Sequence, residues 1–128
     1  METSQLKRIP LFSDASDQEL GVVAHFAESR EVSEGTVLMR EEGFSNELMA
    51  IEDGAADVTR EGEKIAKLKR GDVFGEAGLV KDEKRSATVT ATSPLKLIVL
   101  RYGEVARLRS RAPNIYKRIE KLIEERGG

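Results

Sequence analysis

Glycines recur through the middle of this 128-residue chain at intervals of eight to eleven residues, from Gly35 to Gly71. Short apolar runs lie between them, at 36–39, 48–51, 55–59 and 65–68. Short strands separated by turn residues at this spacing are typical of an all-β sandwich or barrel. The spacing of the glycines therefore predicts a chain that folds mainly into short β-strands.

Two later segments predict strands from their own side-chain pattern. Residues 87–91 alternate between small apolar side chains and threonines, which is the period of a strand with one buried and one polar face. Residues 95–100 are almost all apolar, and the Ser93-Pro94 pair before them favours a turn. These six segments are the clearest of about eight short strands that the chain is expected to form.

Both ends of the chain carry a helical pattern. Ser16 and Glu19 have the spacing of a capping box, and the apolar residues that follow predict a helix over 17–28. After Arg101 the apolar period returns to 3.6, which predicts a short helix over 102–109 and another that begins near Pro113. The apolar stripe of the last helix consists of Ile115, Ile119, Leu122 and Ile123.

The predicted fold class is mainly β with flanking helices: one N-terminal helix, about eight strands, and two C-terminal helices from about residue 102. No linker, repeat or low-complexity segment divides the chain, so we expect a single domain over residues 1–128. The apolar stripe packs either on the strands or on a partner, including a second copy in a homodimer.

Composition excludes several kinds of chemistry. The chain has no cysteine, which excludes disulfides, thiolate zinc sites and cysteine nucleophiles. His25 is the single histidine, so neither a histidine metal site nor a Ser-His-Asp triad is expected. No apolar run approaches the ~20 residues of a membrane span, and the first residues lack a signal-peptide core. We therefore expect a cytoplasmic protein that is not an enzyme and holds no metal or cofactor.

The charge is distributed unevenly, although the net charge of −2 gives no general attraction to nucleic acid. Residues 101–128 hold eight Lys/Arg and four Asp/Glu, whereas residues 1–100 hold thirteen and nineteen. Either the terminal helices carry an ordinary solvated face, or they dock an acidic partner protein. About 27 residues follow the last predicted strand, too few for two helices plus a helix-turn-helix, so no DNA-binding element is expected.

The most specific chemistry lies in the glycine-rich segment 71–79 and in the Arg85-Ser86-Ala87 run after it. Glycine lets the backbone approach a ligand closely, and a tight turn before a helical turn presents free N–H groups to an anion. Arg85 can add two parallel hydrogen bonds to the same anion. Glu76 cannot bind an anion, but a carboxylate beside a phosphate can accept from a sugar hydroxyl. From the residues alone, a glycine-rich hairpin with surface charges remains the alternative.

Phe74-Gly75-Glu76-Ala77-Gly78-Leu79, followed by Arg85-Ser86-Ala87, resembles the phosphate-binding cassette of the cyclic nucleotide-binding domain family. That family includes the catabolite activator protein, the regulatory subunits of protein kinase A and cyclic-nucleotide-gated channels. The resemblance extends to Ile9-Pro10-Leu11-Phe12, to 48–54 and to 68–72, so that it covers about residues 6–125. It implies an eight-stranded, jelly-roll-like β-roll with an N-terminal helix and two C-terminal helices.

The resemblance also implies a role for each matching residue. The implied ligand-binding residues are Gly75, Glu76, Ala77, Gly78, Arg85, Ser86 and Ala87. Glu76 would accept a hydrogen bond from the ribose 2′-hydroxyl, and backbone N–H groups around Ala77 and Gly78 would hold the cyclic phosphate. Arg85 would pair with the phosphate charge.

The other residues of the cassette have implied roles as well. Ser86 would contact the phosphate or the base, Ala87 would contribute backbone, and Phe74 and Leu79 would pack the cassette on the protein core. In some relatives a hydroxyl after the arginine favours guanine, yet bacterial cyclic AMP receptors also carry serine there. We therefore expect cyclic AMP (cAMP) as the ligand, with cyclic GMP (cGMP) as the alternative.

The chain departs from the family pattern in three places. Gly43 comes one position late in its turn, and Ala50 and Ala56 stand where larger apolar residues are usual. The last helix ends soon after Glu125, and no residue that covers the base can be identified.

The resemblance implies a regulatory module in which nucleotide binding moves the C-terminal helices. The alternative is a protein-interaction scaffold with the same roll and little nucleotide affinity, although Glu76 and Arg85 are both intact. A cupin-type enzyme would need several histidine ligands, which the chain does not have. The sequence does not identify the effector, nor whether that effector lies on the same chain.

Overall fold

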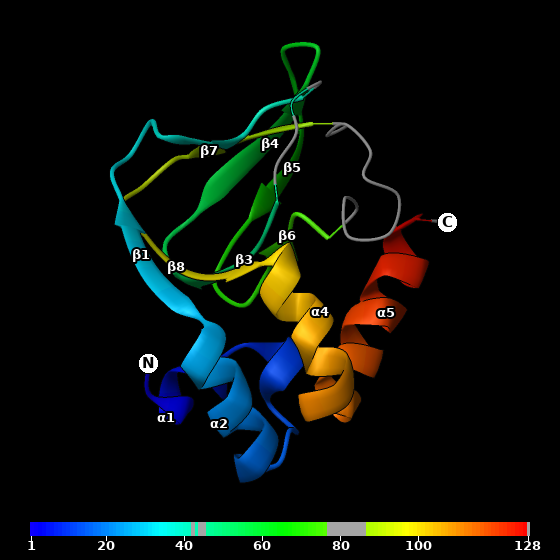
Figure 1. The fold of residues 1–128 in the computed structure, drawn as a ribbon. Helices are drawn as coiled ribbons and strands as arrows, with labels where there is room; N and C mark the ends of the chain where they lie inside the picture. Colours follow the sequence, from blue (N-terminus) through cyan, green and yellow to red (C-terminus); the bar gives the residue numbers. More distant parts are fainter. Residues whose placement is uncertain (42, 44–45, 77–86, 128) are drawn as a thin grey trace.

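The computed structural model describes residues 1–41, 43, 46–76 and 87–127 (Figure 1). The helices before the strands are α1 (Thr3–Leu6), the short 3-10 helix η1 (Pro10–Phe12) and α2 (Asp17–Phe26). The strands are β1 (Glu28–Val32), β2 (Val37–Met39), β3 (Glu47–Asp53), β4 (Ala56–Arg60), β5 (Glu63–Leu68), β6 (Val73–Phe74), β7 (Thr88–Ala91) and β8 (Leu95–Arg101). The C-terminal helices are α4 (Tyr102–Arg111) and α5 (Pro113–Gly127).

The strands form two antiparallel sheets of four strands each, within the described part of the chain. One sheet has the order β1-β8-β3-β6 and the other the order β2-β7-β4-β5. The helices gather beside the first sheet, on the side away from the second (Figure 1). The predicted fold class, an eight-stranded roll with an N-terminal helix and two C-terminal helices, is confirmed.

Long-range strand pairing accounts for two of the differences from the sequence prediction. The N-terminal helix was expected to run to residue 28, but α2 ends at Phe26 and β1 begins at Glu28. All five residues of β1 pair with β8, and these long-range hydrogen bonds take precedence over the local helical pattern. The two-residue strand β6 was not predicted as a separate strand, and it exists through its pairing with β3.

The first sheet lies between two apolar cores, which explains the continuous apolar run of β8. Leu95, Leu97 and Val99 belong to the core between the sheets, whereas Ile98 and Leu100 belong to the core under the helices. Strands buried on both faces are apolar at nearly every position. In β7, by contrast, Val89 and Ala91 are buried and the two threonines are half-buried, which confirms the predicted alternation.

The stripe of α5 packs mainly within its own chain. Ile115 and Ile119 are completely buried in the helical core, and Leu122 and Ile123 are half-buried against it. This packing supports the first of the two alternatives for the stripe. None of the helices in the described residues is long and apolar enough to cross a membrane.

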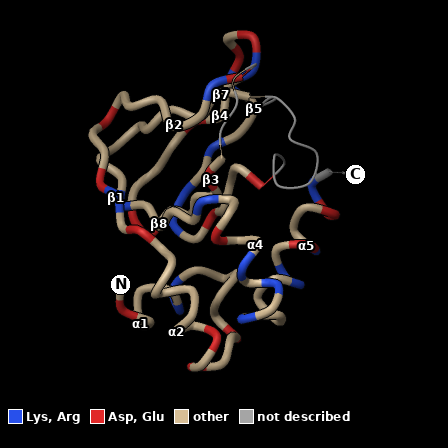
Figure 2. Tube along the Cα trace, viewed as in Figure 1, with Lys and Arg blue, Asp and Glu red and all other residues tan. Residues whose placement is uncertain are grey.

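The basic residues of the terminal helices recur along α4 and α5 (Figure 2), and several of them contact the chain itself. Arg118 donates to the carbonyl oxygens of Pro10 and Leu11, at 3.4 and 3.1 Å, and pairs with Asp14. Arg107 and Arg111 lie over the ring of Phe26, near 6 Å from its centroid. Part of this basic charge therefore joins the helices to one another.

Gly54 closes the turn between β3 and β4 in a conformation that other residues rarely adopt, with a φ of +103°. A Cβ at this position would lie 2.4 Å from the carbonyl oxygen of Pro94 and 2.7 Å from Leu95 Cδ2. We expect Gly54→Ala to lower the free energy of unfolding by about 2–4 kcal/mol, from the clash and the strained φ together. Urea unfolding measures the change.

Gly62→Ala is the matched control, because Gly62 also has a positive φ, +82°, but nothing lies within 4 Å of its added Cβ. Gly62→Ala should lower the free energy of unfolding by about 1 kcal/mol, which is the cost of the backbone conformation alone. Equal losses in the two variants would contradict the proposed clash with the turn at Pro94.

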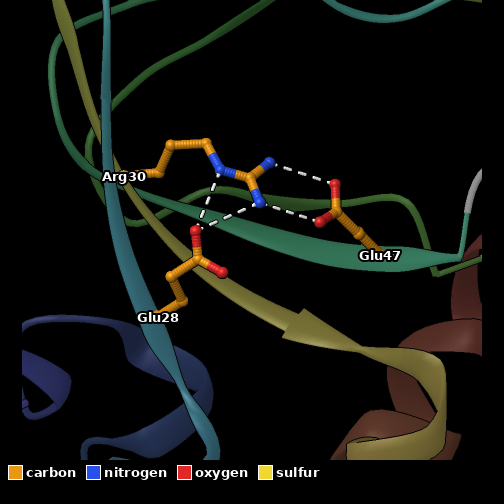
Figure 3. Close-up of polar contacts among 3 residues, drawn as sticks. All are labelled: Glu28, Arg30 and Glu47. Carbon is orange, nitrogen blue, oxygen red and sulfur yellow. Dashed lines mark hydrogen bonds and ion pairs between the residues drawn. The ribbon is translucent and has the colours of Figure 1, made fainter.

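A forked ion pair joins the two strands that flank β8. The guanidinium of Arg30 in β1 donates to both carboxylate oxygens of Glu47 in β3, at 3.1 and 2.8 Å (Figure 3). Glu28 accepts two further bonds from the same guanidinium. The hydrogen bonds and charge of Arg30 lower the pKa of the Glu47 carboxyl below its ordinary value. In turn, the hydrogen bond to Glu47 and the negative charges of Glu47 and Glu28 raise the pKa of Arg30.

The lowered pKa of Glu47 predicts a pH-dependent contribution to stability. A carboxyl whose pKa is depressed by folding stabilises the protein above its unfolded value, here 4.5, and loses that contribution as pH falls through the folded value. At pH 7 we expect Glu47→Gln to be less stable by about 1 kcal/mol, since the pair is partly solvated. The difference in the free energy of unfolding between wild type and Glu47→Gln should shrink as the pH falls below 4.5. Urea unfolding at several pH values measures this difference, and a constant difference would contradict the role of the ion pair.

Candidate functional site

The glycine-rich segment begins at the edge of the first sheet. β6 pairs with β3 through Met49 and Ala50, and Phe74 is buried in the core between the sheets. The expected packing role of Phe74 is thus confirmed. Since β6 is the last strand of its sheet, the backbone that follows Phe74 leaves the sheet at its edge.

The turn before β6 is held by backbone hydrogen bonds and by a close contact. The N–H of Gly71 donates to the carbonyl oxygen of Ile51 at 2.8 Å, and the N–H of Ile51 donates to Asp72 at 2.9 Å. Gly71 has a φ of +92°, and a Cβ there would lie 3.1 Å from Pro10 Cδ. The N-terminal segment thus contacts the turn that precedes the candidate site.

Gly75 joins the candidate site to α4. It is buried and has a φ of +90°, which favours glycine. Its carbonyl oxygen accepts a hydrogen bond from the hydroxyl of Tyr102, the first residue of α4. Tyr102 and Tyr116 both pack against the apolar core under the helices, which supports the interpretation that they anchor α4 and α5. Both also line a groove of about 500 Å³ along these helices.

Glu76 is one of three charged or polar residues that are buried in the described part of the chain, with 9% of its surface exposed. Its carboxylate pairs with the guanidinium of Arg126 in α5, with 3.3 Å between Oε1 and Nη1. The same nitrogen of Arg126 donates to the carbonyl oxygen of Val73. The last turn of α5 is therefore attached directly to the segment that contains Glu76.

Sequence reasoning did not identify Arg126. It is one of many charged residues on the last helix, and no local spacing relates it to Glu76, which lies fifty residues earlier. Their contact depends on how α5 packs across the fold, and a single sequence gives no direct signal for such a contact.

Several predicted site residues lie outside the described residues. These are Ala77, Gly78, Leu79, Arg85 and Ser86. Of the remaining predicted ligand residues, Gly75 and Glu76 follow β6, and Ala87 is buried immediately before β7. The ligand-binding roles of all seven predicted residues stay predictions.

The sequence profile described as "Cyclic nucleotide-binding domain" matches residues 29–112. This match covers more than half of the chain, so the protein belongs to the cyclic nucleotide-binding domain family. The family predicted from residues 74–87 is thereby confirmed. Membership also favours the regulatory binding module over the scaffold.

Individual relatives agree with the family. The chain is 39% identical over 97 residues to a cAMP-dependent protein kinase regulatory subunit of Yarrowia lipolytica. The matched region covers 74% of this chain and 26% of that protein. Among solved structures, the regulatory domain of Toxoplasma gondii PKA with cAMP has a TM-score of 0.82 at 24% identity, over 96% of this chain and 48% of that one. The Thermus thermophilus catabolite activator protein has a TM-score of 0.82 at 23% identity, over 91% of this chain and 57% of that one. At these identities the two structures show the fold alone.

Proposed function

We propose that this chain binds a cyclic nucleotide, cAMP in preference to cGMP, and acts as a non-catalytic regulatory domain. In this proposal the cyclic phosphate is held by backbone N–H groups around Ala77 and Gly78 and by Arg85. Glu76 accepts from the ribose 2′-hydroxyl, while Ser86 and Ala87 complete the contacts to phosphate and base.

The observation that carries the proposal is the buried carboxylate of Glu76 beside Gly75 at the edge of the first sheet. A carboxylate is costly to bury unless it is paired, and here it is paired with a cation from a distant helix. Glu76 keeps a second oxygen for further hydrogen bonds, since an ionised carboxylate offers about four acceptor positions. This arrangement suits an acid that binds a sugar hydroxyl.

The output of the domain is proposed to pass through its C-terminal helices. Tyr102 joins α4 to Gly75, and Arg126 joins α5 to Glu76, so both helices contact the candidate site. The chain spans 26% of the Yarrowia lipolytica subunit and about half of the Toxoplasma gondii chain. The proposal includes an effector domain or partner protein that these helices contact. It also includes a location in the cytoplasm.

Isothermal titration calorimetry of the chain with cAMP and cGMP tests the proposal. We expect saturable binding of both at one site per chain, with cAMP the tighter ligand. Adenosine 5′-monophosphate is the control, because it has the same base and sugar without the cyclic phosphate. Absence of binding to both cyclic nucleotides at millimolar concentration would contradict the proposal and favour the scaffold.

A further inference from the structure

Two arginines near the end of α4 lie over the same aromatic ring. The guanidinium carbons of Arg107 and Arg111 are 5.8 and 5.9 Å from the ring centroid of Phe26, the last residue of α2. Because the two arginines are four residues apart, they lie one turn apart on the same face of α4. This face is the one beside α2 (Figure 1). We call Arg107 and Arg111 the Phe26 arginines.

The Phe26 arginines keep most of their hydrogen-bonding capacity. Both are exposed, and in the part of the chain that the structure describes Arg111 forms no ion pair. Arg107 pairs with Glu104 at 3.7 Å, which is too long for a hydrogen bond, and 64% of its side chain is exposed. A guanidinium has five N–H donors, so both side chains can still bind an anionic group.

The helix that carries the ring is held firmly against the C-terminal helices. Glu19 of α2 accepts hydrogen bonds from the backbone N–H groups of Asn114 and Ile115, both at 3.0 Å. The capping-box spacing predicted that this carboxylate would turn back to Ser16 of its own helix, and the structure corrects that prediction. The hydroxyl of Ser16 does accept from the N–H of Glu19, at 3.2 Å. The carboxylate itself fixes α2 to the beginning of α5.

The ring therefore holds the two guanidinium groups on a rigid support. A side chain that is already positioned loses less conformational entropy when it binds a partner. A guanidinium over an aromatic ring also keeps its planar set of N–H donors, which matches the two oxygens of a carboxylate. The Phe26 arginines are thus better suited to bind carboxylates than an arginine that is free on the surface.

The spacing and the charge of the chain favour one kind of partner. Two side chains one turn apart on a helix have Cβ atoms about 5–6 Å apart, so an acidic helix with carboxylates at this spacing matches the Phe26 arginines. A nucleic acid fits less well. Residues 1–100 hold nineteen Asp/Glu and thirteen Lys/Arg, and this excess of negative charge repels a phosphate backbone.

We propose that the Phe26 arginines dock an acidic helix of a partner protein, with one carboxylate of the partner on each guanidinium. The inference rests on the proposed function, in which the C-terminal helices contact an effector, and it adds the charge of that effector. The surface is separate from the candidate nucleotide site. Arg111 comes nine residues after Tyr102, the residue of α4 that contacts Gly75, and is therefore about 14 Å further along the helix.

An alanine-based helical peptide with glutamates one turn apart, labelled with fluorescein, is the probe. The same peptide with glutamines in place of the glutamates is its control. At low salt, we expect fluorescence anisotropy to show saturable binding of the glutamate peptide with a Kd below about 1 mM, and no binding of the glutamine peptide.

Two variants of the full chain test whether the Phe26 arginines bind the peptide. Arg111→Ala should weaken binding about 3- to 10-fold, because it removes one of the two positioned guanidinium groups. Arg109→Ala is the matched control, because it removes the same charge from an exposed position of the same helix. Its affinity should stay within about twofold of wild type.

A third variant tests the ring. Phe26→Leu keeps both charges and an apolar side chain but removes the aromatic support, and we expect binding to weaken about 2- to 5-fold. Thermal melting without ligand checks that all three variants fold. Calorimetry with cAMP should give Arg111→Ala an affinity within about twofold of wild type, because Arg111 lies away from the nucleotide site.

The outcomes separate this inference from nucleotide binding. Equal affinities of Arg111→Ala and Arg109→Ala, or equal binding of the two peptides, would overturn the inference. Tighter binding of a DNA duplex than of the glutamate peptide would assign the surface to nucleic acid and would also overturn it. A chain that binds cAMP but not the glutamate peptide would overturn the inference alone. A chain that binds the glutamate peptide but neither cyclic nucleotide would support the inference and overturn the proposed nucleotide binding.

Discussion

Replacing Glu76 by glutamine is expected to weaken cAMP binding about 10- to 100-fold, because a hydrogen bond to a charged group contributes about 1.5–3 kcal/mol. The substitution keeps the shape of the side chain and removes its charge. It weakens both the proposed bond to the ribose 2′-hydroxyl and the observed ion pair with Arg126. Titration calorimetry measures the loss, and Glu125→Gln, an exposed position on α5, is the control for the change in net charge.

The 2′-deoxy analogue of cAMP isolates the sugar contact. It should bind wild type more weakly than cAMP does, and it should lose less than cAMP when Glu76 is replaced, since both changes remove one hydrogen bond. The affinity for the 2′-deoxy analogue that is still lost in Glu76→Gln then measures the contribution of Glu76 that acts through Arg126. Fully additive losses in this double-mutant cycle would mean that Glu76 does not contact the ribose hydroxyl.

Arg85→Lys should weaken cAMP binding at least about tenfold although it keeps the positive charge, because only a guanidinium gives two parallel hydrogen bonds to a phosphate. Lys84→Arg, the reverse exchange one position earlier, is the matched control and should leave affinity within about twofold. Binding by Arg85→Lys that equals wild type would place Arg85 away from the phosphate. The melting temperature without ligand is expected to stay within about 2 °C of wild type.

The strands and helices were predictable where one local pattern dominated. The threonine alternation at 87–91 and the 3.6 period after Arg101 correspond to β7 and to the two terminal helices. The end of α2 was misplaced because β1 is defined by pairing with β8, about seventy residues later in the chain. β6 was missed as a strand for the same reason: two residues carry no period, and only their partners in β3 make them a strand.

The candidate site was predictable as a segment but not as an arrangement. The glycines and the acid at 75–76 were identified because their chemistry is local to one stretch of chain. Two contacts were not identified: the ion pair of Arg126 with Glu76, and the hydrogen bonds that the Glu19 carboxylate accepts from backbone N–H groups at the start of α5. Each joins residues that are fifty or more positions apart. The capping-box spacing at Ser16 even predicted a different partner for Glu19. A side chain with two satisfactory partners goes to the one that the tertiary packing brings near, and local spacing does not reveal that choice.

The most direct test of the account is to locate the bound nucleotide on the folded chain. Two-dimensional NMR of the 15N-labelled protein, titrated with cAMP, reports each backbone amide separately. We expect the largest shifts at Gly75, Glu76 and Ala87 and smaller ones in the last turn of α5, with the first turn of α5 unchanged. Saturable binding with unmoved amides at Gly75, Glu76 and Ala87, and shifts gathered instead along the groove of Tyr102 and Tyr116, would contradict it.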